Sequence, residues 1–131
     1  EQNTIHPEHQ WNSAKPEKYL FNITDTNQLY KIVFVIRHHN AYHYKNIWVE
    51  LSHSSAGEKA QTETFNLNLA DDQKGWLGTG MDDIYDQRIP LYSKPVKLNY
   101  GIHTFTIKHT MREDPLQNIL STGIRIEKAA L

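Results

Sequence analysis

Residues 101–109 read GIHTFTIKH, and the larger side chains of this stretch recur at every second position. His103, Phe105, Ile107 and His109 share one face, while Thr104, Thr106 and Lys108 lie on the other. A period of two is typical of a strand that buries one face. The stretch therefore predicts a β-strand that turns its even-numbered residues to solvent.

The same alternation recurs along the whole chain. Residues 29–37 (LYKIVFVIR) are apolar on both faces at their centre, which predicts a strand in the middle of a sheet. One or two further strands are expected within residues 76–98. The remaining alternating stretches are 17–25, 46–53, 62–70 and 122–128.

Turns separate these stretches, and no long helical pattern interrupts them. Residues 54–58 and 99–101 carry turn residues, and only residues 114–120 look briefly helical. We predict an all-β fold over residues 17–131, a single antiparallel β-sandwich of jelly-roll type with about seven to eight strands. Residues 1–16, with Pro7 and Pro16, predict a loosely ordered N-terminal arm that Trp11 can attach to the sandwich.

Composition excludes several classes of protein. The 131 residues suit one domain and contain no cysteine, which rules out disulfides, thiol nucleophiles and thiolate metal sites. The net charge of −1 argues against nucleic acid or an anionic membrane surface as a partner. The longest apolar run, Ile32 to Ile36, is far shorter than the ~20 residues of a membrane span. We expect no signal peptide within the chain.

Three histidines, His38, His39 and His43, suggest a metal site at first sight. Ligands four residues apart converge on a helix, whereas this stretch lies between two strands. We expect a polar hairpin connection instead, with Tyr42 and Tyr44 covering an edge. No nucleophile elbow is present, and a pair of catalytic carboxylates cannot be recognised from spacing alone. We therefore expect no catalytic residue, no metal and no cofactor, and a protein that is not an enzyme.

Residues 75–86, GWLGTGMDDIYD, are rich in glycine and aspartate. A dinucleotide loop requires a following helix, which is absent, and the acidic spacing differs from that of a calcium loop. A structural calcium site that also uses Asp71 and Asp72 stays open. We predict an architectural crossing between strands, in which the aspartates Asp82 and Asp83 cap the turn, Trp76 and Leu77 enter the core, and Gly75, Gly78 and Gly80 supply unusual backbone angles. Gly123 is expected at a strand entry or bulge.

Four residues are candidates for contact with a partner or a glycan. Trp48 lies on the outward alternation of its strand, and Trp76 and Tyr85 lie in the glycine-rich loop. Exposed aromatic rings can stack on sugars, but they also serve as half-buried covers of a sheet. Arg112 follows a strong strand, where it can pair with Glu113, Asp114 or Asp82.

Three stretches in order resemble the GldH-type gliding-motility lipoproteins. They are Gly75 to Gly80 with Asp82 and Asp83, then Gly101 to Ile107 leading into Met111, Arg112 and Glu113, and finally Gly123 to Lys128. Trp11, Phe21, Asp25-Thr26 and the stretch from Arg37 to Asn46 fit as well, so the resemblance covers nearly the whole chain. His109-Thr110 departs from the Gln-Ala pair that often precedes Met-Arg in the family, so a partner contact made by Met111-Arg112 would have different neighbours here.

The resemblance implies a β-rich domain held at the cell envelope, on the periplasmic side of the outer membrane, by a lipid-bearing cysteine upstream of Glu1. It implies a non-enzymatic accessory role in gliding motility and the associated secretion machinery, through contacts with other envelope proteins. The alternative is a carbohydrate-binding sandwich that engages polysaccharide or peptidoglycan. The family provides no catalytic residue that can be carried over.

Overall fold

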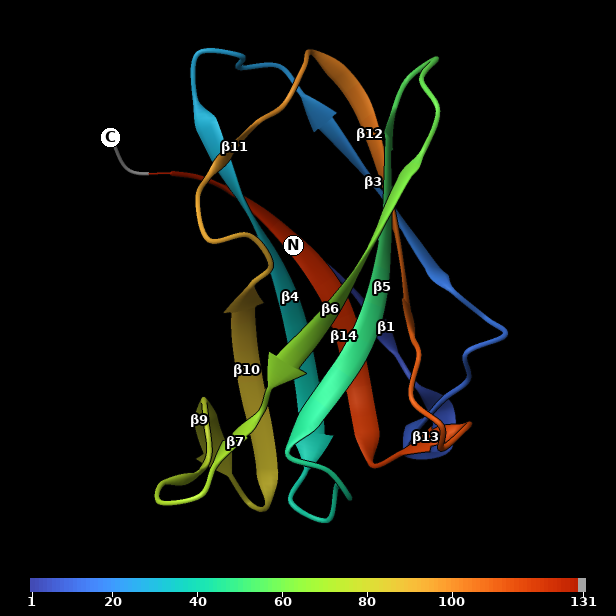
Figure 1. Ribbon diagram of the computed structural model, residues 1–131, viewed down its shortest axis with the longest axis vertical. Coiled ribbons are helices and arrows are strands. Elements are labelled where there is room, and N and C mark those ends of the chain that lie inside the picture. Colours follow the sequence, from blue (N-terminus) through green and yellow to red (C-terminus); the bar gives the residue numbers. More distant parts are fainter. Residues whose placement is uncertain (130–131) are drawn as a thin grey trace.

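The computed structural model describes residues 1–129 as two antiparallel sheets packed face to face (Figure 1). The first sheet contains, in spatial order, β1 (Gln2–Ile5), β14 (Ile119–Lys128), β4 (Leu29–His39), β10 (Ile84–Pro90) and β9 (Thr79–Met81), and β11 (Val96–Lys97) also pairs with β4. The second sheet contains β3 (Glu17–Ile23), β12 (Gly101–His109), β5 (Asn46–Ser55) and β6 (Gln61–Asn68). The all-β sandwich is therefore confirmed.

The eight longest strands follow the wrapped order of a jelly roll. Numbered along the chain, the first sheet holds strands one, eight, three and six, and the second holds two, seven, four and five. The expected seven to eight strands correspond to these alone. The described residues form 14 strands, because β9 and β11 extend the first sheet and four more short strands form two small sheets. In these, β2 (Gln10–Trp11) pairs with β13 (Leu116–Gln117), and β7 (Ala70–Asp71) pairs with β8 (Gly75–Trp76).

The core lies between the two sheets and uses the alternation seen in the sequence. From β4, Ile32, Phe34 and Ile36 face inward, and each is at most 3% exposed. They belong to one buried cluster with residues of the second sheet, listed here: Tyr19, Ile47, Val49, Leu51, Leu67, Phe105 and Ile107. Burial of this apolar area provides the main driving force for the fold.

The N-terminal residues differ from the loosely ordered arm that we predicted. They form β1, a short 3₁₀ turn η1 (Pro7–His9) and β2. β1 is the first strand of the jelly roll and pairs with Ser121 to Ile124 of β14. Its sequence, QNTI, lacks apolar alternation because β1 is an edge strand whose side chains are only partly buried. Residues 130 and 131, which we assigned to the sandwich, lie outside the described residues.

The briefly helical stretch 114–120 is also extended in the structure. Leu116 and Ile119 are fully buried, and a bulge shifts the register of β14 between Ile119 and Ser121. Between Leu116 and Ile119, Asn118, with a φ of 66°, separates β13 from β14, and the two buried apolar side chains three residues apart mimic the spacing of a helix.

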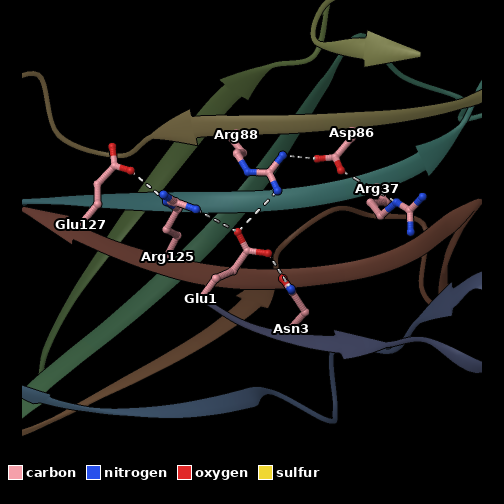
Figure 2. A network of polar contacts seen from close by, with 7 residues as sticks. All are labelled: Glu1, Asn3, Arg37, Asp86, Arg88, Arg125 and Glu127. Atoms are coloured by element: carbon pink, nitrogen blue, oxygen red, sulfur yellow. Dashed lines mark hydrogen bonds and ion pairs between the residues drawn. The ribbon is translucent and has the colours of Figure 1, made fainter. Parts of the chain in front are cut away.

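A chain of alternating charges crosses the outer face of the first sheet (Figure 2). Glu1 accepts a hydrogen bond from Asn3 at 2.7 Å and pairs with Arg88 at 3.5 Å and Arg125 at 3.8 Å. Glu127 extends this chain beyond Arg125, and Asp86 joins Arg88 to Arg37. Each half-exposed pair contributes only about 0–1 kcal/mol. Together they hold the first residue of the chain against β10 and β14.

Buried histidines give the fold a defined response to acid. Burial lowers the pKa of His6 to about 4, helped by the nearby His109, and it also lowers the pKa of His38. An unfolded histidine titrates near 6.5, so the unfolded chain binds more protons as the pH falls below that value. The stability due to these neutral rings is therefore complete above pH 6.5 and is lost toward pH 4.

We expect the free energy of unfolding to fall by about 2–3 kcal/mol between pH 7 and pH 4.5 on account of His6 alone. Urea unfolding at three pH values measures this change. The Thr122 hydroxyl lies 2.8 Å from His6 Nε2, and glutamine at residue 6 can still bond to it. The variant His6→Gln should therefore show a smaller dependence of the free energy of unfolding on pH. An equal slope in both proteins would contradict the assignment.

Candidate functional site

Three connecting segments gather at one end of the sandwich, where β4 and β12 finish and β5 and β14 begin (Figure 1). They are residues 40–45, 69–83 and 110–118, and we call this region the loop end. Hydrogen bonds join them: Asn40 N donates to Asp83 O at 2.8 Å, and Asn118 Nδ2 donates to Ala41 O at 3.2 Å. The loop end therefore brings together stretches that are far apart in the sequence.

A groove of about 460 Å³ lies at the loop end and includes two of the four predicted contact residues, Trp48 and Arg112. Trp48 is 42% exposed because its neighbours on β5, Ile47 and Val49, take the inward positions. We call this feature the Trp48 groove. Its complete lining is Tyr44, Asn46, Trp48, Thr110, Met111 and Arg112.

Backbone hydrogen bonds at the end of the β5/β12 ladder place Met111 in this groove. Thr110 N donates to Trp48 O at 2.9 Å, which adds one more rung after the last strand pair. Trp48 N then donates to Met111 Sδ at 3.2 Å, so a side chain replaces the next backbone partner. A thioether sulfur is a weak acceptor, but it fixes the direction of the side chain.

His109 supports the same turn from the core. Its Nδ1 accepts from Met111 N at 3.2 Å, and its Nε2 lies 2.9 Å from Trp11 O. Since a carbonyl only accepts, the ring carries its proton on Nε2 and is neutral. Burial lowers the pKa of His109, although Asp114 lies 3.3 Å from Nε2. The groove is thus anchored to the buried Trp11.

Arg112 does not form the ion pairs that we considered. Glu113 instead bonds to His43 Nδ1 at 2.6 Å, and Asp114 bonds to Ser13 Oγ at 2.5 Å. Within residues 1–129, the exposed Arg112 side chain has no ion pair and no hydrogen-bond partner. An available guanidinium therefore lies at the rim of the Trp48 groove.

Trp76 and Tyr85 lie elsewhere at the loop end and are half-buried. Trp76 packs against His38 with ring centroids 4.6 Å apart, and Tyr85 stacks on His38 at 5.8 Å. Trp76 lines a second groove of about 330 Å³, and Tyr44 lines both grooves. The structure thus brings Trp48 and Arg112 together and places Trp76 and Tyr85 apart from them.

Four groove residues were not among the predicted contacts: Tyr44, Asn46, Thr110 and Met111. We interpreted Tyr44 as an edge cover, and Met111 only as part of the family resemblance. The histidine stretch is not the polar hairpin connection that we predicted, because β4 and β5 lie in different sheets and His38 and His39 still belong to β4. His38 is buried with its Nε2 2.9 Å from Gln87 Nε2, and Tyr42 enters the core instead of covering an edge. In the described part of the chain, no three metal-ligating side chains cluster.

The glycine-rich stretch shapes the crossing from β8 to β10. Gly75 and Gly78 have positive φ, but Gly80 does not, so the unusual angle predicted for Gly80 is wrong. Gly80 is required by crowding, because a Cβ there would lie 2.5 Å from Tyr85 Cε1. Asp82 and Asp83, with φ of 52° and 67°, form the two-residue turn of the β9–β10 hairpin.

We expect Gly80→Val to reduce stability more than Asp83→Ala. Valine at residue 80 would displace the Tyr85 ring from its packing on His38 and Trp76, at a cost of about 1–3 kcal/mol. Alanine at residue 83 keeps the turn but must hold a positive φ and loses the 3.1 Å bond from Asn40 Nδ2, at a cost of about 1 kcal/mol. Thermal unfolding of both variants measures the difference, and equally small effects would mean that the hairpin is flexible.

Comparisons with known proteins agree with the motif pattern. A family model described as GldH lipoprotein matches residues 1–126. A curated protein from Christiangramia forsetii, "Gliding motility lipoprotein GldH homolog", is 24% identical over 129 residues, which cover 92% of this chain and 79% of the relative. No solved structure matches the chain. Residues 1–129 include no helix that is long and apolar enough to cross a membrane.

Proposed function

Because the chain belongs to the GldH lipoprotein family, we propose that it is a non-enzymatic accessory component of the gliding-motility machinery and its associated secretion apparatus. The curated relative is named as a gliding motility lipoprotein, and we extend that role to this chain. It acts through protein–protein contacts with other envelope proteins.

The Trp48 groove is the observation that supports this proposal. Protein interfaces are enriched in Trp, Tyr, Met and Arg, and their strongest contacts are aromatic or arginine side chains in pockets. Tyr44, Trp48, Met111 and Arg112 provide this composition in one groove. Met111 is held by a hydrogen bond from Trp48 N to its sulfur and by one from its own N to His109 Nδ1, so this residue needs little further ordering on binding.

For the location, we propose the periplasmic side of the outer membrane. The family is one of lipoproteins, which means attachment to the cell envelope through a lipid. A lipid-bearing cysteine upstream of Glu1 would tether the sandwich and leave the loop end available to partners. The full-length gene tests this point: a lipobox cysteine shortly before Glu1 is expected, and a cytoplasmic start there would contradict it.

Glycan binding is the second candidate. The half-exposed indole of Trp48 lies in one groove with the amide of Asn46 and the hydroxyl of Thr110, groups that can stack on and bond to a sugar. Titration of the Trp fluorescence with soluble polysaccharides and peptidoglycan fragments, beside Trp48→Ala and Trp76→Ala, separates the candidates. Tight binding that depends on either tryptophan would favour the glycan.

The test of protein contact uses a photo-crosslinking amino acid placed in living cells. At residue 110, which lines the groove, it should capture an envelope protein, and Trp48→Ala should abolish that capture. Ile102 is the matched control position, because it lies on the same sheet and is 42% exposed, as is Trp48. Capture that is absent at residue 110, or equal at both positions, would overturn the proposal.

A further inference from the structure

We infer that the Trp48 groove binds an extended segment of its partner in which an apolar side chain has a carboxylate beside it. This inference rests on the proposed function and specifies the chemistry that the groove recognises. The apolar side chain lies on Tyr44, Trp48 and Met111, and the carboxylate pairs with Arg112.

The apolar part of the groove is well defined. Tyr44 and Met111 are half-buried and pack against the hydrophobic core, so their positions are fixed from below. The 42% exposed Trp48 provides one wall. A volume of about 460 Å³ falls within the range of sites that enclose a small ligand or a large side chain.

Charge complementarity indicates the carboxylate of the partner segment. The neighbouring acids already have cationic or polar partners: Glu50 pairs with Lys108 at 3.6 Å, Asp72 pairs with Lys45, and Glu113 bonds to His43 and to Gln117 N. Arg112 is left without a partner in the described residues. Its planar guanidinium matches a carboxylate through two parallel hydrogen bonds.

The spacing of the groove residues favours a peptide over a flat surface. Arg112 directly follows Met111 in the sequence, so a carboxylate on Arg112 and a side chain on Met111 belong to adjacent or alternate residues of an extended partner. Aromatic anchors next to charged rim contacts are the usual form of such recognition. The partner segment is therefore acidic and contains an apolar residue.

Three acetylated and amidated heptapeptides test the inference against the 131-residue chain. The first is Gly-Ser-Glu-Phe-Glu-Ser-Gly, the second replaces both Glu by Gln, and the third replaces Phe by Ala. Binding is followed by ¹H–¹⁵N NMR shifts of the Trp48 indole and the Arg112 side chain. We expect the first peptide to bind about fivefold more tightly than the second, the value of about 1 kcal/mol for a part-exposed ion pair.

Arg112→Gln should remove that preference, so that the acidic peptide and its Gln counterpart bind with equal affinity. Trp48→Ala should lower the affinity for both peptides. Lys59→Gln is the matched control, because it removes the same charge from an exposed residue that lies outside the groove. A preference that survives Arg112→Gln, equal binding of the Phe and Ala peptides, or binding of peptidoglycan fragments in place of the peptides would overturn the inference.

Failure here can be told from failure of the proposed function. If all three peptides fail while capture from residue 110 persists, the groove contacts a partner by other chemistry and the inference is wrong. If capture is also absent, the proposed function is wrong as well.

Discussion

Replacing Trp11 with alanine is expected to lower the free energy of unfolding by about 3–5 kcal/mol, because a large aromatic side chain is removed from a closed site. Trp11 is fully buried and packs against His6, Phe34 and His109, with ring centroids 5.3–6.3 Å apart. For a chain of this size the loss corresponds to a fall in melting temperature of about 10–15 °C. Chemical and thermal unfolding measure both quantities.

Trp11→Phe is the matched control. The indole Nε1 of Trp11 is buried and has no hydrogen-bond partner in the described part of the chain. Phenylalanine therefore keeps most of the ring without this unbonded donor, and we expect less than half of the alanine effect. A loss below about 1 kcal/mol for Trp11→Ala would show that residues 1–16 do not contribute to the core.

Replacing Gly123 with valine is expected to release β1 from the first sheet, at a cost of about 3 kcal/mol or more. Gly123 lies inside β14, so the predicted strand entry or bulge at this residue is wrong. A Cβ on Gly123 would collide with the backbone oxygen of Gln2 and with the side chain of Asn3. The backbone of Gln2 cannot move away without breaking its pairing with β14. Loss of amide hydrogen-exchange protection over residues 2–5 gives a direct readout beside the change in melting temperature.

Ser121→Val provides the control on the same face of the same strand. Residue 121 pairs with Ile5 at the open edge, and valine suits a strand, so we expect a change within about 0.5 kcal/mol. If Gly123→Val left the protection of β1 intact, the close approach of the two strands would not be a requirement of the fold.

Most of the fold could be predicted because its strands alternate clearly. The stretch 101–109 coincides with β12, and the interior positions of His103 and His109 follow from the same periodicity. β1 was missed for a physical reason. An edge strand whose side chains are only partly buried needs no apolar alternation, and its place is decided by pairing with a segment more than 110 residues later.

The candidate site was only partly visible in the sequence. The outward direction of Trp48 follows from its strand, but its neighbour Met111 is 63 residues away and is positioned by a sulfur contact. Trp76 and Tyr85 were expected as contact candidates in the glycine-rich loop, and Trp76 also as a residue that enters the core. Trp76 packs against the core, and both rings cover His38, a buried ring whose partner Gln87 is brought near by the pairing of β4 with β10. Sequence periodicity does not show which strands pair and which side chains the pairing brings together.

The position of β1 has a mechanical consequence. β1 runs from Gln2, which pairs with Ile124 halfway along β14, to Ile5, which pairs with Ser121 near the loop end. Its long axis therefore points from the proposed tether toward the proposed partner site. A force between membrane and partner would therefore act along the strand, and the hydrogen bonds between β1 and β14 would share it in shear. Bonds pulled in parallel resist together, whereas bonds opened from one end fail in turn. The first residues of the chain would thus transmit traction as well as complete the sheet.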